Sequence, residues 1–224
     1  MKKIVLITSG GSGSRTNLNI PKQFVELKGK PLLMYSFNTF LKYSPDIEFV
    51  LVLADNQISD WAKLCEKQQF NINHKVVAGG PTRFHSVKNG LKLVEKGVLV
   101  AIHDGARPLV SLETISRVFN FAERYGNAIP SIDIAESVRM VENVHNSPIE
   151  RTKLKIIQTP QCFKSDIIKD AYNQNYDEKF TDDATVLESR GHKIFLTEGN
   201  PENIKITTAI DFKIAETLLP KLKN

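Results

Sequence analysis

Cysteine is scarce in this sequence. Only Cys65 and Cys162 occur among the 224 residues, and they lie far apart, with no CxxC pair and no histidine at ligand-like spacing. The composition therefore indicates neither a disulfide framework nor a structural zinc site. We expect two buried thiols in a reducing compartment.

Long hydrophobic runs are also lacking. The first apolar segment, KIVLIT at residues 3–8, reaches glycine too soon for the core of a signal peptide. It is far too short to cross a bilayer. The sequence therefore predicts a cytoplasmic protein that has no membrane partner.

Neither sign of charge forms a block or a tail. The chain has 30 basic and 25 acidic residues and a formal net charge of +5, spread along its length. This balance suits an anionic small molecule as well as nucleic acid, but no RNA- or DNA-binding motif favours the latter, and we expect no nucleic-acid partner. With 41% hydrophobic and 25% charged residues, residues 1–224 are expected to form one globular domain.

Short apolar segments alternate with helix-length amphipathic stretches. The expected strands lie at residues 3–8, 48–54, 74–79, 98–104 and 127–132. The expected helices lie at residues 30–43, 57–70, 82–96 and 111–125, the last with Ser111 as its N-cap. Strands that are apolar on both faces and separated by helices predict an α/β fold with a doubly wound, mostly parallel sheet. Ligands of such sheets bind at the carboxyl ends of the strands.

Residues 134–158 break this pattern. Short stretches of alternating apolar and polar residues flank the turn-rich NVHNSP. This pattern predicts a protruding β-arm whose partner is another subunit. The α/β style then returns in segments 164–175 and 181–191, a strand at 193–199 and a closing helix from about residue 208.

A glycine-rich loop, SGGSGSRTNLNIPK at residues 9–22, follows the first expected strand. Glycines expose backbone N–H groups that can cradle phosphate oxygens. Thr16 stands where a dinucleotide-binding fingerprint has its third glycine, and the G-K-[ST] of a Walker A loop is absent. The remaining pattern, with Lys22 seven residues after Arg15, suits a triphosphate. The alternative is that the glycines form turns and the cations are merely solvated.

Two further strand ends carry similar signals. AGGPTRFHSV at residues 78–87 leads from glycines into a helix with Arg83 and Ser86 in its first turns, where anions are favoured. Asp104 ends the strand at 98–104 and precedes Gly105 and Arg107. This carboxylate either caps a turn or holds Mg²⁺, which usually binds one or two carboxylates plus substrate phosphates. Together the strand ends predict a site for a metal–triphosphate complex.

Six ordered segments, GGSGSR…IPKQF, GGPTRFHSVKNGL, HDGARPLV, QTPQCF, TDDATVLE and NIKIT, resemble the 2-C-methyl-D-erythritol 4-phosphate cytidylyltransferases among the nucleotidyltransferases. The resemblance covers nearly the whole chain. It implies a Rossmann-like fold, a homodimer joined through the arm, Mg²⁺ or another divalent cation as cofactor, and CTP and a polyol phosphate as substrates.

The resemblance also implies roles for individual residues. On the nucleotide side it implies contacts of CTP with Ser9, Gly10, Gly11, Gly13, Gly80, Ser86, Asp104 and Gly105. Around the acceptor it implies contacts with Arg107, Ser137, Arg151, Thr159, Thr181 and Lys205. Asp104 matches the family's metal ligand, and Ser86 the residue that recognises the base. Arg15 and Lys22 match its transition-state stabilisers, while Arg151 and Lys205 orient the acceptor phosphate as further catalytic residues.

The chain departs from the family pattern in places. Thr8 and Ser9 replace a small apolar pair before the glycines, and Thr16 replaces a common methionine. The arm begins with ESVR, which makes Ser137 the stand-in for a substrate-binding threonine, whereas an offset of a few residues points to Asp133 instead.

The expected chemistry requires no general base. A phosphate monoester has its second pKa near 6 and is already anionic at neutral pH, so the difficulty is to bring two anions together among fixed cations. His103 is accordingly interpreted as a structural residue at a strand end. The TDDA segment suggests either a second metal site or a helix N-cap at Thr181 with acids in the first turn.

Two competing functions stay open at this point. One is a cytidylyltransferase for ribitol 5-phosphate or another polyol phosphate, although Ala106 and Leu109 are closer to the methylerythritol pattern. The other is a non-catalytic nucleotide-binding module. Retention of Arg15, Lys22, Asp104 and Lys205 argues against that module, because a binder has no need of groups aimed at a transition state.

Overall fold

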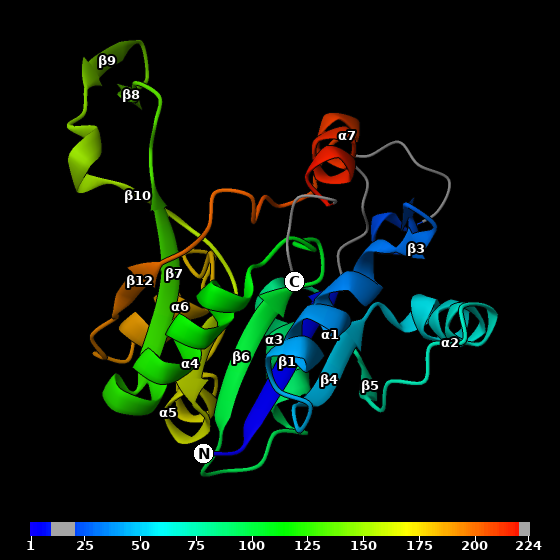
Figure 1. Cartoon of the computed structure of the whole chain (residues 1–224). Helices are drawn as coiled ribbons and strands as arrows, with labels where there is room; N and C mark the ends of the chain where they lie inside the picture. The colour runs from blue at the N-terminus through cyan, green and yellow to red at the C-terminus, as the bar shows by residue number, and fades with distance from the viewer. Residues whose placement is uncertain (10–20, 220–224) are drawn as a thin grey trace.

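The computed structural model describes residues 1–9 and 21–219, which are organised around one mixed β-sheet (Figure 1). In these residues the sheet has eight strands in the order β10-β7-β11-β6-β1-β4-β5, with β12 beside β7. They are β1 (Lys3–Ser9), β4 (Glu48–Leu53), β5 (Lys75–Ala78), β6 (Leu99–Asp104), β7 (Asn127–Asp133), β10 (Lys155–Ile157), β11 (Gln161–Lys164) and β12 (Leu196–Glu198). β1 pairs in parallel with β4 and β6, and β4 pairs in parallel with β5. The predicted doubly wound, mostly parallel sheet is confirmed.

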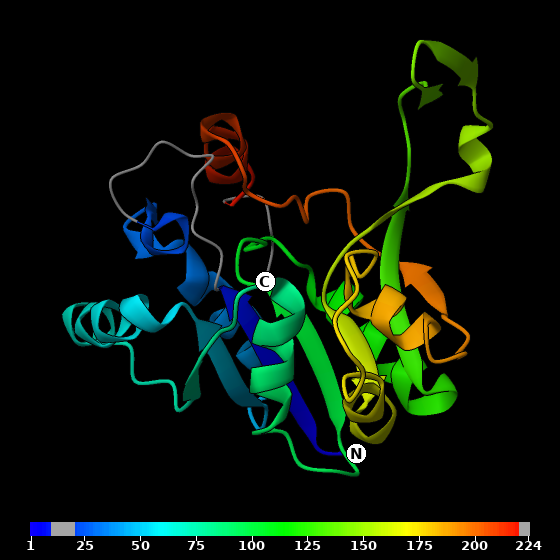
Figure 2. The same cartoon turned by 180° about the vertical axis from the view of Figure 1, so that it is seen from behind.

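Helices cover both faces of the sheet, as Figures 1 and 2 show from opposite sides. They are α1 (Leu32–Tyr43), α2 (Ile58–Lys67), α3 (Arg83–Leu91), α4 (Leu112–Tyr125), α5 (Ser165–Ala171), α6 (Asp183–Glu188) and α7 (Ala209–Leu218). Three short 3₁₀ turns, η2 (Lys22–Phe24), η3 (Asp55–Gln57) and η4 (Arg151–Lys153), and the small strands β2 (Glu26–Leu27) and β3 (Lys30–Pro31) complete the body. No helix within the described ranges combines the length and apolar character needed to span a bilayer.

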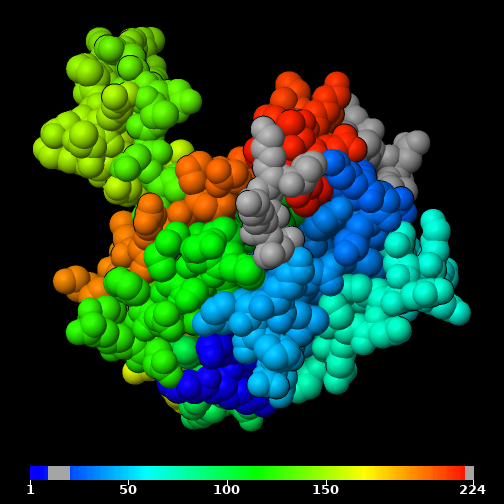
Figure 3. Space-filling model, viewed as in Figure 1, coloured from blue at the N-terminus to red at the C-terminus, as the bar shows by residue number. Residues whose placement is uncertain are grey.

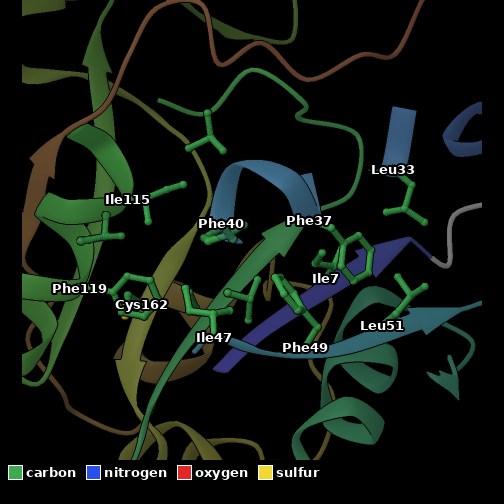
Figure 4. Close-up of a cluster of buried hydrophobic side chains, with 14 of the residues drawn as sticks. Ile7, Leu33, Phe37, Phe40, Ile47, Phe49, Leu51, Ile115, Phe119 and Cys162 are labelled. Carbon is green, nitrogen blue, oxygen red and sulfur yellow. The ribbon is translucent and has the colours of Figure 1, made fainter. Parts of the chain in front are cut away.

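The core consists of two layers because neighbouring residues of a strand point to opposite faces. On β1, Val5 and Ile7 pack with α1 and α4 in the cluster of Figure 4. Ile4 and Leu6 pack on the other face with side chains of α3 and α5. Since β1 is buried on both faces, its sequence is continuously apolar, which explains why it was recognisable as a central strand.

The predicted cap of α4 is confirmed. The Ser111 side chain accepts a hydrogen bond from the backbone N–H of Thr114, and Gly126, at φ 95°, ends the helix in the left-handed region. The helix expected at 82–96 is shorter than predicted and ends at Leu91.

The segment predicted as an arm leaves the body of the molecule (Figure 3). Its strands β8 (Arg139–Glu142) and β9 (His145–Pro148) form an antiparallel hairpin that pairs with no other strand among the described residues. None of residues 132–157 is buried. The base of the arm joins the sheet through β10, which pairs antiparallel with β7.

Two sequence-based expectations need correction. The antiparallel strand β11, which lies between β6 and β7, was not predicted, because its four residues are too few to show a strand period. The two cysteines were expected to be buried, but only Cys162 is, whereas Cys65 is partly exposed. Burial raises the pKa of both thiols, that of Cys65 to about 11, so both are unreactive thiols at neutral pH.

Candidate functional site

A cavity of about 420 Å³ opens beyond the carboxyl end of β6. Six charged side chains line its wall. Asp182 and Glu188 lie at the two ends of α6. The other four are Arg83 at the start of α3, Asp104 at the end of β6, Arg107 in the following turn and Lys205 in the loop before α7. We call these four residues the Asp104 cluster.

Asp104 is the centre of this cluster. Its Oδ2 lies 2.9 Å from Nζ of Lys205 and 3.7 Å from Nε of Arg107. Its Oδ1 lies 3.5 Å from Nε of Arg83. Burial by itself would raise the pKa of the Asp104 carboxyl, but the positive charges of Arg83, Lys205 and Arg107 outweigh it and hold the pKa far below its usual range. Asp104 is therefore an anion at every physiological pH.

Arg83 is fixed from the opposite side by Asp183. Its two terminal nitrogens donate to the two carboxylate oxygens of Asp183 at 2.8 and 2.7 Å. Burial would lower the pKa of Arg83, yet Asp183 and Asp104 raise it well above its ordinary value. The arginine is thus a permanent cation between two carboxylates.

The turn that carries Asp104 is held by a chain of buried hydrogen bonds. The backbone N–H of Asp104 donates to Oγ1 of Thr159 at 3.0 Å, and that hydroxyl lies 3.2 Å from Nδ1 of His103. Nε2 of His103 lies 3.0 Å from the Arg107 carbonyl oxygen. Burial lowers the pKa of His103 to about 4, so the neutral ring accepts from Thr159 and donates to Arg107. His103 is structural, as predicted.

Arg107 is anchored by the loop before α7. Its NH1 donates to the carbonyl oxygen of Asn203 at 2.7 Å, and the Asn203 side chain donates to the carbonyl oxygen of Thr159 at 2.8 Å. Burial lowers the pKa of Arg107, and the neighbouring Asp104 opposes that shift. The loop therefore orients a cation and brings Lys205 to the same carboxylate.

Lys22 lies close to this loop. Its Nζ donates to the carbonyl oxygen of Ile206 at 3.1 Å, one residue after Lys205. The next residue, Gln23, is 1% exposed and donates to the carbonyl oxygen of Ser9 at 3.0 Å. This hydrogen bond ties the end of β1 to η2 and so places Lys22 beside the carboxyl edge of the sheet.

Two glycines permit close approaches at this edge. A Cβ on Gly105 would lie 2.8 Å from Oγ of Ser9 and from a Leu33 methyl carbon, so the turn after β6 packs directly on the end of β1. At the end of β5, the N–H of Gly80 donates to Oγ of Ser86 at 3.0 Å. The hydroxyl that is expected to recognise a base is thereby held at the first turn of α3.

Five of the twelve described candidates line the cavity, namely Asp104, Arg107, Thr159, Thr181 and Lys205. Five others lie at nearby strand ends and turns but not in its lining, namely Ser9, Lys22, Gly80, Ser86 and Gly105. The arm carries Ser137 and Arg151, which are exposed, and Arg151 donates to the carbonyl oxygen of Ala135. The candidates Gly10, Gly11, Gly13 and Arg15, and with them Thr16, lie outside the described residues.

Asp133, the alternative to Ser137, lies at the base of the arm. It forms an ion pair with Lys155 and lines a separate hollow of about 740 Å³ with Glu136. Its position does not decide between the two alternatives.

The helix interpretation of TDDA is confirmed for the acidic first turn, which contains Asp183, but is wrong about the cap residue. The N-cap of α6 is Asp182, whose side chain accepts from the N–H of Thr185, rather than Thr181. Asp183 is not available to a second metal, because Arg83 occupies both of its oxygens. Thr181 instead lines the cavity.

Sequence reasoning missed the Arg83–Asp183 pair and the role of Asn203. All three residues stand in quoted motifs, GGPTRFHS, TDDA and NIKIT. Only Arg83, interpreted as an anion-binding residue at a helix start, received a role. The signal that could have found the pair is an aspartate in a helix's first turn followed by apolar residues, since a buried carboxylate needs a cationic partner.

The oxygen ligands at the cavity suit a metal ion that takes most of its ligands from the substrate and from water. Among residues 1–9 and 21–219, no group of three or more His, Cys, Asp or Glu side chains gathers to hold a metal ion. Asp104 offers one ionised carboxylate at the cavity, and Mg²⁺ commonly binds one or two carboxylates plus substrate phosphates and water. The residues present therefore fit magnesium bound together with a nucleotide, with Asp104 as the protein ligand.

Comparisons with known proteins agree with this geometry. The model of the IspD family, 2-C-methyl-D-erythritol 4-phosphate cytidylyltransferase, matches residues 3–221. The enzyme of that name from Bacteroides thetaiotaomicron is 46% identical over 219 residues, covering 98% of this chain and 100% of the relative. The one from Porphyromonas gingivalis is also 46% identical, covering 97% of this chain and 98% of the relative.

Solved structures show the same similarity. The 4-diphosphocytidyl-2C-methyl-D-erythritol synthase of Anaerococcus prevotii superposes with a TM-score of 0.83 at 25% identity, over 98% of this chain and 96% of the other. The cytidylyltransferase of Thermus thermophilus superposes with a TM-score of 0.79 at 26% identity, over 98% of this chain and 100% of the other. These neighbours share the α/β fold of this chain.

Proposed function

This chain belongs to the family of 2-C-methyl-D-erythritol 4-phosphate cytidylyltransferases, and from that premise we propose its reaction and the roles of its residues. The enzyme joins CTP to 2-C-methyl-D-erythritol 4-phosphate, giving 4-diphosphocytidyl-2-C-methyl-D-erythritol and pyrophosphate in the non-mevalonate isoprenoid pathway. An oxygen of the acceptor phosphate forms a bond to the α-phosphorus of CTP. The bond from that phosphorus to the bridging oxygen breaks, and pyrophosphate leaves with its electron pair.

The convergence of three cations on one buried carboxylate supports this proposal most directly. Arg83, Arg107 and Lys205 lie within 3.7 Å of Asp104. Because Arg83 is also paired with Asp183, Arg107 and Lys205 are the two cations of the cluster that have Asp104 as their only carboxylate partner within it. Phosphoryl and nucleotidyl transfer depends mainly on such preset charge, because negative charge accumulates on the phosphate oxygens in the transition state.

On the nucleotide side, Asp104 would hold Mg²⁺ against the phosphates of CTP. The metal supplies charge neutralisation when it is bound. Lys22 lies beside Lys205 through the carbonyl of Ile206 and is proposed to stabilise the transition state together with Arg15. Ser86, held by Gly80 at the start of α3, is proposed to bind the base.

On the acceptor side, Arg107 and Lys205 are proposed to hold the phosphate of the polyol. Lys205 is well suited to this role because its side chain is 45% exposed, whereas that of Asp104 is 11% exposed. The ammonium group can therefore turn from the carboxylate toward an incoming phosphate. No general base is required, since the acceptor is already ionised at neutral pH.

Dimerisation is proposed to complete the site. The arm carries Ser137 and Arg151, and Arg151 donates to the carbonyl oxygen of Ala135 in the arm's own backbone. A hairpin with exposed Met140, Val141 and Val144 has an apolar surface that a second copy of the chain can cover. We therefore propose that the arm of one subunit supplies Arg151 to the acceptor site of its neighbour.

The test is a pyrophosphate-release assay in which the four ordinary nucleoside triphosphates are crossed with methylerythritol 4-phosphate and ribitol 5-phosphate. We expect release with CTP and methylerythritol phosphate and a much lower, still measurable rate in the Asp104→Asn variant. Preference for ribitol phosphate would reassign the acceptor, and no release from any pair would reject the enzymatic proposal. Omission of divalent cations tests the cofactor.

A further inference from the structure

Arg83 differs from the other cations of the Asp104 cluster in how its hydrogen-bonding groups are used. Both terminal nitrogens donate to Asp183, at 2.8 and 2.7 Å, and only the Nε edge faces Asp104, at 3.5 Å from Oδ1. A guanidinium is planar, so a bidentate contact fixes the direction of its remaining N–H. Arg83 is therefore held with one donor edge turned to the carboxylate.

The partner that fixes Arg83 is itself immobilised. Asp183 is 0% exposed, and its Oδ1 also accepts from the hydroxyl of Tyr172 at 2.6 Å. Tyr172 is 2% exposed. The start of α6 is further attached to β11, because Oε1 of Gln161 accepts from the N–H of Ala184 at 2.9 Å. A buried chain thus runs from the core through Asp183 and Arg83 to Asp104.

The two oxygens of Asp104 have different neighbours as a result. Oδ2 lies near Lys205, whose side chain is 45% exposed and can turn away, and near Arg107. Oδ1 lies near Arg83, whose position is fixed by the core. When Lys205 turns to a substrate phosphate, Arg83 and Arg107 remain to set the orientation of the carboxylate.

We propose that Arg83 is a positioning residue that acts through Asp104, with Asp183 and Tyr172 as its supports, and not a phosphate-binding cation. This inference rests on the proposed function, since it concerns how the carboxylate is presented to the metal–nucleotide complex. It differs from the expectation that Arg83 binds an anion at a helix start. Its end-on pair of N–H groups is bound to Asp183, and the edge that carries Nε faces Asp104. Both edges therefore already face a carboxylate rather than a phosphate.

The choice of variants follows from the burial of Asp183. Arg83→Ala would leave that carboxylate buried and unpaired, which destabilises folded proteins strongly. The paired variant Arg83→Met with Asp183→Asn removes both charges and keeps an acceptor for Tyr172. The surface pair Arg190 and Asp170, which lie 3.8 Å apart, provides the matched control through Arg190→Met with Asp170→Asn.

The experiment is a mutant cycle that combines the paired variant with Asp104→Asn. With Asp104 present, the paired variant should lower kcat about 10- to 100-fold, as loss of groups that orient a metal ligand does. In the Asp104→Asn background it should lower kcat no further, because a residue that acts through Asp104 has nothing left to position. A further 10- to 100-fold fall in kcat in the Asp104→Asn background would overturn the proposal.

A second measurement does not depend on turnover. CTP with Mg²⁺ should raise the unfolding temperature of the wild type, and the Mg²⁺ concentration giving half of this rise should increase about 10-fold in the paired variant. The control pair should change neither quantity. A lowered unfolding temperature with an unchanged Mg²⁺ midpoint would mean a purely structural role and would also overturn the proposal.

Arg83→Lys serves if the paired variant does not fold. It keeps a cation opposite Asp183 but has one ammonium group, which cannot hold both carboxylates in the same geometry. In the same cycle Arg83→Lys should lower kcat when Asp104 is present and should lower it no further in the Asp104→Asn background. A further fall in that background, or an unchanged Mg²⁺ midpoint, would count against the proposal. A wild type that is inactive toward every triphosphate would reject the proposed function. If the wild type is active but the Arg83 variants lower kcat further in the Asp104→Asn background, only this inference is rejected.

Discussion

The Asp104 cluster and the arm carry residues expected to bind the same acceptor phosphate, yet they are built in opposite ways. Asp104 is 8% exposed and is held by ion pairs and by Thr159. None of arm residues 134–157 is buried, and the hairpin pairs only with itself among the described strands. One half of the proposed site is preorganised by burial. The other half depends on what the arm contacts.

The difference predicts two classes of variant. A change near the cluster should alter catalysis or the stability of the body, because its groups share buried hydrogen bonds. A change in the arm should leave the stability of a single subunit nearly unchanged and act through assembly or through the neighbour's site. The following predictions test this division, from the largest expected effect to the smallest.

Lys22→Ala should have the largest effect. Removal of one preset charge that stabilises a transition state costs about 2.7–4 kcal/mol, or roughly 10²–10³ in kcat. We expect a normal unfolding temperature and little change in the KM for CTP, measured by pyrophosphate release. Lys63→Ala on α2, whose side chain is 78% exposed, is the control and should behave as wild type. An unchanged kcat in Lys22→Ala would remove this residue from the catalytic groups.

The stability of the body should depend on pH through His103. Burial lowers its pKa to about 4, whereas an unfolded histidine titrates near pH 6.5. Between these values the unfolded chain binds a proton that the folded chain does not, so stability is fully present above pH 6.5 and falls as the pH drops. The loss should total about 3 kcal/mol by pH 4.

Urea unfolding across this pH range measures the effect. His103→Gln should flatten the dependence, and His145→Gln in the exposed arm should retain the wild-type slope. Equal slopes in the His103→Gln variant and the wild type would show that the buried ring is not the responsible group.

Much of the body could be predicted from the sequence. Apolar strands and the Ser111 cap are local signals, and the carboxyl ends of parallel strands must meet at one edge, which brought Asp104 and Arg107 into the predicted site. The Arg83–Asp183 pair was missed because its partners are 100 positions apart and each also has a local interpretation at a helix start. β11 was missed because four residues are too few to show a distinct period.

For the arm, the sequence predicted the structure but not the function. Its existence followed from the change of pattern at residues 134–158, and β8 and β9 confirm a hairpin there. Its role does not follow from local signals, because exposed side chains such as Arg151 acquire partners only by assembly. For the same reason the choice between Ser137 and Asp133 stays a prediction.

Arg151→Ala should show whether the arm serves the neighbouring subunit. A lost hydrogen bond to a charged phosphate costs about 1.5–3 kcal/mol, so kcat/KM for the acceptor should fall roughly 10- to 150-fold with an unchanged unfolding temperature. Lys153→Ala, on the same 3₁₀ turn and 76% exposed, is the control.

Mixed dimers sharpen this prediction. If the arm completes the neighbour's site, a dimer of one Lys22→Ala subunit and one Arg151→Ala subunit contains one intact site. Random mixing should then restore about a quarter of wild-type activity. If the arm acts within its own chain, each site combines one sound half and one defective half of the same subunit, and mixing then restores nothing.

The smallest expected effect belongs to Val144, at the tip of the hairpin and 87% exposed. Each buried methylene-sized group contributes about 0.8 kcal/mol, so Val144→Ala should weaken a dimer by about 1.6 kcal/mol, or roughly 10-fold in Kd, for each copy of this side chain that the dimer covers. Sedimentation equilibrium measures this change, and Leu93→Ala, a partly exposed side chain of the body at 38% exposure, should leave Kd unaltered. A Kd that is insensitive to Val144 but weakened by Leu93→Ala would place the interface on the body. The arm would then be an independent projection, and the contrast between a buried half and an assembled half of the site would not hold.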